Sequence, residues 1–308
     1  MSRYVLRRIL QTIPVVLGTT FVIFAMVFAL PGDPIRALAG DKFLAPSVIA
    51  QLHKEYHLDD SLPIQYAKYM SGLAHGDFGR DFNGDAVSAL IRERWPVTVK
   101  LGLTAWVLET VFGILLGLLA GLRRGGVVDR GVLLLTTVVI SVPALVLAFL
   151  AQFVLGVKLG IFPIAGVADG WPVSYLLPAV ILAALDLAFI ARLTRTNLIE
   201  NRRADFVRTA IAKGLGPWRV VGKHTLRNSL IPVVTYLALS FGYLMSGTVI
   251  VEGIFNLPGL GNLVFQAIQR QEGPVVVGVS TLLVLVFILT NLVVDVLYGV
   301  LDPRIRYD

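Results

Sequence analysis

Two acidic residues lie deep inside apolar stretches of the sequence. Glu109 falls near the middle of an apolar run at 99–122, and Asp186 lies about one turn from the centre of another at 174–191. An acidic residue at the centre of a bilayer costs about 2.5–3.5 kcal/mol on insertion scales, so such residues face a bundle interior or a water-filled path. Two interpretations stay open: contact with a substrate ammonium group, or a structural hydrogen bond to a neighbouring Ser, Thr or Arg.

The four histidines offer little further chemistry. His53 and His57 are one helical turn apart, a spacing that can hold a metal ion, but no third ligand is evident and a solvated pair on a helix face is the alternative. Because no histidine lies in an apolar run, an intramembrane hydrolase built on a Ser–His pair is not supported. The sequence has no cysteine, which excludes disulfides, thiolate metal sites and cysteine nucleophiles. We therefore expect no catalytic residues and no metal site.

A glycine–lysine pair also fails as a nucleotide site. Gly222-Lys223-His224 has Pro217 where a phosphate-binding loop carries its first glycine, and it lacks the Ser or Thr that ligates Mg²⁺. We expect no cofactor in this chain. If transport here is driven by ATP, another chain hydrolyses it.

The composition indicates a membrane protein. Of the 308 residues, 56% are hydrophobic and only 15% are charged, with a mean hydropathy of +0.77; soluble proteins average about 25% charged residues. A transmembrane helix needs about 20 apolar residues. Six runs qualify, at about 9–30, 99–122, 132–156, 174–191, 229–251 and 275–300. The net charge of +7 then reflects topology rather than nucleic-acid binding.

The basic residues predict the orientation. With the N-terminus in the cytoplasm, 17 of the 27 Lys and Arg residues lie on the cytoplasmic side and 9 on the other side, as the positive-inside rule requires. The first run has no convincing cleavage site and is longer than the core of a signal peptide, so we expect an uncleaved anchor. The prediction is a multi-pass protein of the plasma (inner) membrane, residues 1–308 forming one membrane domain with both termini cytoplasmic.

Two loops carry helix signals. In the extracytoplasmic segment 31–98, helices are expected at 47–57, after Ser61-Leu62-Pro63, and between Asp85 and Pro96, forming a small helical cap. In the cytoplasmic segment 192–228, a short helix at 204–213 ends at Gly214 in the manner of a glycine C-cap, and Pro217 opens a second helix.

The cytoplasmic segment carries nine basic and two acidic residues. Topology and contact with lipid headgroups explain that charge. They do not explain an ordered helix with Phe206, Val207, Ala210 and Ile211 on one side, which needs a protein groove to bury it. We therefore expect this segment to dock on a partner protein.

Gly113, Gly117 and Gly121 form a ridge of small residues at four-residue spacing. Such a ridge lets two membrane helices approach closely, within this chain or with a partner.

Several motifs in one order resemble a known family, the permeases of ATP-binding-cassette (ABC) importers. Residues 205–216 and 224–232 resemble the "EAA" loop of these permeases, in the form found in the dipeptide, oligopeptide and nickel group. Supporting matches are 31–34 (PGDP), 76–80 (GDFGR), 252–261 (EGIFNLPGLG) and 301–307 (LDPRIRY). The resemblance covers essentially the whole chain and is closest to DppB-type subunits of dipeptide systems.

The resemblance implies a type I ABC importer permease with six transmembrane helices, which passes dipeptides or short peptides by alternating access. It implies as partners a homologous second permease, two ATPase subunits that bind ATP and Mg²⁺, and an extracytoplasmic substrate-binding protein. The residues carried over to ATPase coupling are Arg208, Thr209, Ala210, Lys213, Gly214, Leu215 and Gly216. Arg208-Thr209-Ala210 stands where the family pattern has Glu-Ala-Ala, so the glutamate's role does not transfer. Glu109 and Asp186 match no family motif.

A second hypothesis is a stand-alone secondary transporter or channel that uses Glu109 and Asp186 as ion sites. It predicts discontinuous spans and an internal repeat, and the sequence shows neither.

Overall fold

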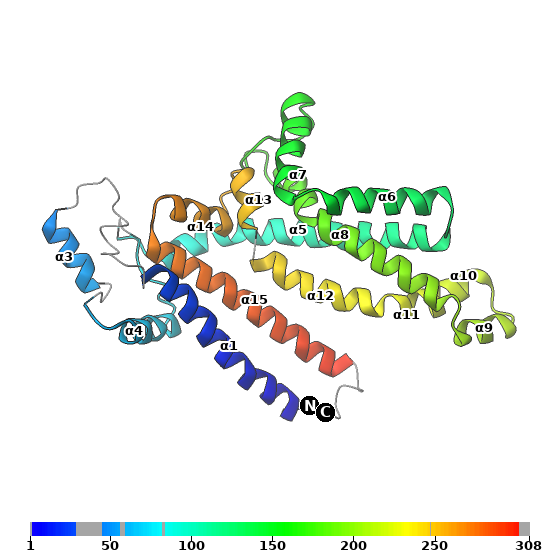
Figure 1. Ribbon diagram of the computed structural model, residues 1–308, viewed down its shortest axis with the longest axis horizontal. Helices are drawn as coiled ribbons and strands as arrows, with labels where there is room; N and C mark the ends of the chain where they lie inside the picture. Colours follow the sequence, from blue (N-terminus) through cyan, green and yellow to red (C-terminus); the bar gives the residue numbers. More distant parts are fainter. Residues whose placement is uncertain (1, 29–44, 56–58, 82–83, 247, 302–308) are drawn as a thin grey trace. The chain divides into compact units, whose positions relative to one another are not determined.

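The computed structural model describes residues 2–28, 45–55, 59–81, 84–246 and 248–301 (Figure 1). Over these ranges the secondary structure is helical, apart from one isolated bridge between Arg80 and Ala86. The predicted all-α class is confirmed. The chain divides into two compact units, residues 1–99 with 245–308 and residues 100–244, and each is described by itself below.

The first unit contains six helices within the described ranges, together with the first part of α5. They are α1 (Ser2–Phe28), α3 (Pro46–Glu55), α4 (Leu62–Ala74), α13 (Val249–Ile254), α14 (Leu260–Gln269) and α15 (Gly273–Leu301). The helices α1 and α15 lie side by side and run in opposite directions (Figure 1). Near their ends Arg8 pairs with Asp295 at 3.2 Å. Against α1 packs α4, whose Tyr66 hydroxyl donates to the Leu17 carbonyl at 2.8 Å.

The core of this unit lies where α14, α15 and the start of α5 meet. Leu260, Val264, Val275 and Val279 are buried there against Val87. Burying apolar area of this kind is the main term that stabilises such a contact, at about 25 cal/mol per Å².

The second unit contains the rest of α5 (Val87–Leu122), most of α12 (Ile231–Ser246), and the helices between them. These are α6 (Val127–Ser141), α7 (Ala144–Ala151), η1 (Gln152–Lys158), α8 (Val173–Asn201), α9 (Asp205–Ala212), α10 (Pro217–Arg219), η2 (Val220–Leu226) and α11 (Arg227–Ser229). The helix α8 contacts α6, α7, η2 and α11, so it is the central element of this unit.

Four helices are long and apolar enough to span a membrane, and two bent pairs bring the possible total to six. The four are α1 from Leu6, α5, α8 and α15 up to Val296; the pairs are α6 with α7–η1, bent by 103°, and α10–η2–α11 with α12, bent by 46°. Two of the six predicted spans are therefore not straight helices. The first bend follows from Pro143: proline disfavours the α conformation of the residue before it, and Val142 is extended.

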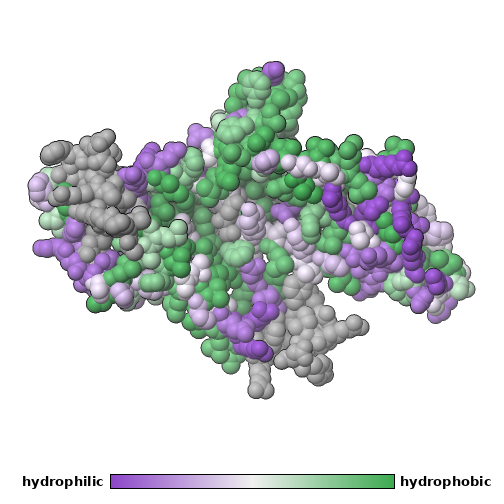
Figure 2. Space-filling view, in the orientation of Figure 1, coloured by the Kyte–Doolittle hydropathy of each residue, from purple (hydrophilic) through white to green (hydrophobic). Residues whose placement is uncertain are grey.

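The surface of α7 and η1 is almost wholly apolar, as Figure 2 shows at the top of the view. Leu145, Phe149 and Phe153 are each about half exposed, at 48%, 53% and 51%. Apolar side chains on every face of a helix suit a lipid environment rather than water.

The loop helices differ in part from the prediction. Helices form at 46–55 and 62–74, close to the first two predicted. A separate third helix ending at Pro96 does not form, because α5 begins at Val87 and continues through Pro96 without a break. A proline inside a helix removes one backbone donor and usually bends or breaks the helix, but here α5 continues past Pro96.

Candidate functional site

The basic loop of the second unit forms a helix, a corner and a second helix. The first helix is α9, and Gly214 follows it with φ at +75°, where its N–H donates to the Ile211 carbonyl at 2.8 Å. Only glycine adopts such a φ without strain. Gly216 then precedes Pro217, the first residue of α10. The chain therefore turns sharply within residues 213–216, after α9 has ended.

The predicted apolar side of α9 is split by the structure. Val207 and Ala210 are buried against Val220, with Leu215 packed beside them. Phe206 and Ile211 remain 40% and 60% exposed. The expectation that all four need a partner's groove is wrong for Val207 and Ala210, because residues three apart share a helix face and this face meets η2.

The remaining predicted coupling residues lie on the outside of this segment. Arg208 is exposed and reaches Asp205 at 3.4 Å, an exposed contact of little energetic weight. Thr209, Lys213 and Gly214 are also exposed. Trp218 is 87% exposed, and the sequence analysis did not single it out. An exposed tryptophan beside such a corner is typical of docking surfaces.

Two carboxylates within the predicted spans accept hydrogen bonds from α12. Glu109 on α5 is fully buried, and the Ser240 hydroxyl donates to its Oε1 at 2.6 Å. Asp186 on α8 is half-buried and accepts a hydrogen bond from the Tyr236 hydroxyl. Tyr236 and Ser240 are one turn apart, so one face of α12 receives both acids. Among the described residues, Oε2 of Glu109 has no hydrogen-bond partner.

The glycine ridge of α5 packs against α8. A Cβ on Gly113 would lie 2.7 Å from Ile190, one on Gly117 would lie 2.5 Å from the Ala191 carbonyl oxygen, and one on Gly121 would lie 2.8 Å from Leu198. Real Cβ atoms do not come so close to their neighbours, so the two helices approach closely only because three glycines lie at the contact.

Only one histidine of the spaced pair lies within the described residues. His53 lies on α3 and is 3.7 Å from Asp59, whereas His57 lies outside the described residues. Within the described ranges, no three His, Asp or Glu side chains come together as metal ligands.

Two family descriptions match the chain, and between them they cover nearly all of it. Residues 113–307 match the binding-protein-dependent transport system inner membrane component, and residues 1–102 match the N-terminal part of the same kind of membrane component.

The chain belongs to this family of permeases.

Full-length relatives agree with that assignment. A putative peptide transport system permease protein of Brucella abortus is 39% identical over 315 residues, which cover all of both chains. The glutathione transport system permease protein GsiC of Salmonella typhimurium is 40% identical over 308 residues, again covering all of both. The resemblance found in the sequence motifs is confirmed, and the chain is an integral inner-membrane permease subunit of an ABC importer.

One family motif, residues 252–261, is explained by a buried carboxylate that the sequence analysis did not interpret. Glu252 is fully buried in the first unit of the permease. Its carboxylate accepts hydrogen bonds from the Thr98 hydroxyl at 2.8 Å, the Asn262 N–H at 3.0 Å, and the Thr248 hydroxyl. Leu260 N–H in turn donates to Thr98 at 2.8 Å. Glu252 thus ties the N-terminus of α14 to α5 and α13.

The glycines of the same motif leave room for this network. A Cβ on Gly259 would lie 2.5 Å from the carboxyl carbon of Glu252, and one on Gly261 would lie 2.6 Å from Val249 Cα. Asn256 has φ at +46°, which asparagine tolerates better than most residues. The motif is therefore a folded turn around one acid.

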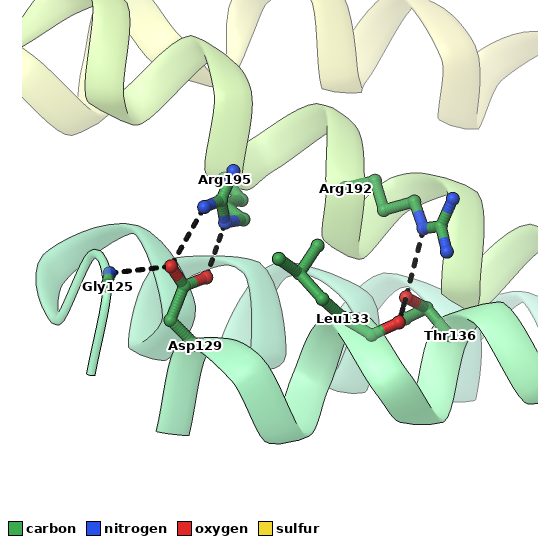
Figure 3. Close-up of polar contacts among 6 residues, drawn as sticks. All are labelled: Gly125, Asp129, Leu133, Thr136, Arg192 and Arg195. Atoms are coloured by element: carbon green, nitrogen blue, oxygen red, sulfur yellow. Dashed lines mark hydrogen bonds and ion pairs between the residues drawn. The ribbon is translucent and has the colours of Figure 1, made fainter. Parts of the chain in front are cut away.

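Sequence reasoning also missed the polar contacts between α6 and α8 that Figure 3 shows. It counted Arg192 and Arg195 only as topology charges. The structure pairs Arg195 with Asp129 and Arg192 with Thr136. A signal was present in the sequence, since both arginines fall at the end of an apolar run, where an unpaired charge is costly.

Proposed function

We propose that this permease carries dipeptides or other short peptides across the plasma membrane, as the non-catalytic transmembrane subunit of its importer. The supporting observation is the full-length similarity to permeases named for peptide and glutathione transport. Glutathione is itself a tripeptide, so both names describe short peptides. Within the proposal, two partner ATPase subunits bind ATP and Mg²⁺ and hydrolyse the nucleotide, a homologous permease completes the pathway, and a binding protein delivers the peptide.

The docking surface for the ATPases, in this proposal, is the exposed side of α9 and the corner after it. Its apolar contacts are Phe206, Ile211 and Trp218, all at least 40% exposed. Arg208 and Lys213 add positive charge beside them, which suits an acidic rim on the partner. The other side of α9 is packed against η2, so a push on the exposed side moves a supported helix rather than a loose loop.

The proposed orientation puts this surface, with both termini, in the cytoplasm. The charge distribution supports it, since 17 of 27 basic residues fall on that side. Residues 31–98 then form the extracytoplasmic cap and residues 192–228 the cytoplasmic coupling loop.

Glu109 and Asp186 are proposed to face the peptide path and to receive the peptide's ammonium group. Both acids lie against one face of α12, and Oε2 of the buried Glu109 is left without a partner among the described residues. A buried carboxylate oxygen in that state favours a cationic or hydrogen-bonding guest. The hydrogen bonds from Ser240 and Tyr236 would hold the two acids in place before the peptide arrives.

The test is purification of the permease from its native membrane, with identification of what accompanies it and an ATPase assay with and without dipeptide-loaded binding protein. We expect two ATPase subunits, a second permease and stimulated hydrolysis. A permease that purifies alone, without ATPase activity, and still moves solute in liposomes would refute the proposal.

A matched pair of glycine variants isolates the coupling surface. Gly214→Pro cannot keep φ at +75° because proline fixes φ near −65°. We expect the variant to insert normally and to uncouple the two activities, so that the ATPases hydrolyse ATP without driving peptide uptake. Gly222→Ala is the control, since nothing lies within 4 Å of its new Cβ. Normal uptake by Gly214→Pro would sink the assignment of this corner to coupling.

A further inference from the structure

Asp129 and Arg195 form an ion pair that joins the turn between α5 and α6 to α8. The Arg195 guanidinium donates twice to the Asp129 carboxylate, at 2.5 Å and 2.8 Å. The Arg195 side chain is 20% exposed and the Asp129 side chain is 3% exposed. Asp129 also accepts from Gly125 N–H at 2.8 Å, and Gly125 has φ at +78° within that turn (Figure 3). One carboxylate therefore fixes the shape of the turn and its attachment to α8. Two-point guanidinium–carboxylate pairs are the geometrically stricter kind of ion pair.

A second contact holds the same two helices one turn earlier in α8. Arg192 donates to the Thr136 hydroxyl at 2.9 Å and to the Thr137 hydroxyl at 2.6 Å. Arg192 and Arg195 share a face of α8, and Asp129 and Thr136 are two turns apart on a face of α6. Contacts at two levels prevent α6 from pivoting about either one.

The other limb of the hairpin, α5, is attached to α8 as well. The glycine ridge brings the two helices into close contact over Gly113, Gly117 and Gly121. Near the turn, Arg202 Nη1 donates to the Leu122 carbonyl at 3.3 Å. Both limbs of the α5–α6 hairpin are thus fixed to the C-terminal half of α8.

The same half of α8 continues directly into α9. The link is short and hydrogen-bonded: Ala204 N–H donates to Asn201 O at 3.2 Å, and Val207 N–H donates to Ala204 O at 3.0 Å. Ser229 on α11 also donates to the Asn197 carbonyl at 3.2 Å. No long loop separates α9 from the arginines that hold the hairpin.

We infer that the α5–α6 turn, α8 and α9 move as one rigid body during transport, with Asp129 and Arg195 as the positioning residues that carry a displacement of α9 into α5 and α6. The inference rests on the proposed docking of ATPases on α9. It assigns the pair a part in transport, since this pair holds the α5–α6 turn itself to α8. Without it, a displacement of α9 would reach the turn only through Arg192 and the glycine ridge.

The first test measures the rigid body directly. The sequence contains no cysteine, so Arg124→Cys and Arg203→Cys can carry spin labels; both positions are exposed. In the complex with its ATPases, we expect the label distance to be the same without nucleotide and with ATP trapped. In Asp129→Asn the distance should change on trapping ATP. A change in the otherwise unaltered protein of more than about 2 Å, the scale of helix shifts in switching proteins, would overturn the inference.

The second test measures coupling. Asp129→Asn should raise the ATP hydrolysed per peptide transported at least about fivefold, the lower end of typical coupling effects, with normal recovery of the ATPases. Asp295→Asn is the control, because it removes an ion pair between α1 and α15 that lies off this route; its ratio should not change. If Asp129→Asn does not insert, Arg195→Lys replaces it. Lysine keeps the positive charge but loses the two-point contact, so the ratio of ATP hydrolysed to peptide transported should rise in the same way.

The outcomes separate this inference from the proposed function. An unchanged ratio in an assembled Asp129→Asn complex, or in Arg195→Lys where that variant is needed, overturns the rigid-body inference alone. Failure of the unaltered permease to recover any ATPase overturns both.

Discussion

Replacement of Glu252 by alanine should destabilise the permease more than any exposed acidic substitution. The change leaves three buried donors without an acceptor: the Thr98 and Thr248 hydroxyls and the Asn262 N–H. Each buried unsatisfied donor costs about 1–3 kcal/mol. Because rotating hydroxyls recover part of that loss, we expect a total of about 3 kcal/mol.

The measurement is thermal unfolding of the detergent-solubilised permease. Because chains of 150–250 residues lose about 2–4 °C per kcal/mol and larger chains lose less, the melting temperature should fall by up to about 6–12 °C. Glu93→Ala is the matched control, since Glu93 is an exposed acid on the same helix as Thr98, and surface changes stay within about 0.5 kcal/mol. Equal melting temperatures for Glu252→Ala and Glu93→Ala would show that the acid does not hold α14 in place.

Three further predictions follow from other parts of the structure. Gly117→Leu should lower the free energy of unfolding by about 1–3 kcal/mol through overpacking, because the new Cβ alone would lie 2.5 Å from a carbonyl oxygen of α8. Gly131→Leu is the control, since nothing lies within 4 Å of its new Cβ. Equal melting curves for the two variants would contradict the close contact between α5 and α8. Trp218→Ala should leave the melting temperature unchanged and weaken ATPase recovery about tenfold, the effect of losing one docking anchor of about 1.4 kcal/mol; undiminished recovery would remove Trp218 from the docking surface. Burial raises the pKa of Tyr69 in α4 to about 12, so between pH 10 and 12 the unfolded chain loses a proton that the folded chain keeps, and the free energy of unfolding falls as pH rises. Tyr69→Phe should show a smaller fall in the free energy of unfolding over this pH range. An identical fall in both proteins would contradict the raised pKa of Tyr69.

The helices and the family were predictable from the sequence because their signals are local. Apolar length gives the spans, and the motifs around Gly214 and after Glu252 are contiguous in the chain. The bend at Pro143 was missed because an apolar run reads the same whether straight or broken. The continuation of α5 through Pro96 was missed because a proline inside a helical pattern ordinarily indicates that the helix ends or bends there, whereas α5 accommodates it.

The candidate site was less predictable because its contacts join residues far apart in the chain. Asp129 meets Arg195 across 66 positions, and Thr98 meets Glu252 across 154. The cost of burial singles out Glu109 from the sequence alone but does not identify its hydrogen-bond partner. That partner, the hydroxyl of Ser240, is identified only by the packing of α12 against α5. The split of the apolar side of α9 likewise depended on η2, which folds back on it.

The pairing of α1 with α15 has a consequence for how the permease is made. The two helices belong to one unit, yet the whole of residues 100–244 is synthesised between them. At roughly 5–20 residues per second, α1 exists for on the order of ten to fifty seconds before its partner emerges from the ribosome. During that interval Arg8 has no Asp295 to pair with, and the apolar side of α1 depends on lipid or on the insertion machinery. Residues 100–244 can complete their own packing first, so the first helix made is among the last to reach its final neighbour. A ribosome that stops before α15 leaves α1 packed against α4 but without its longest contact, the one with α15.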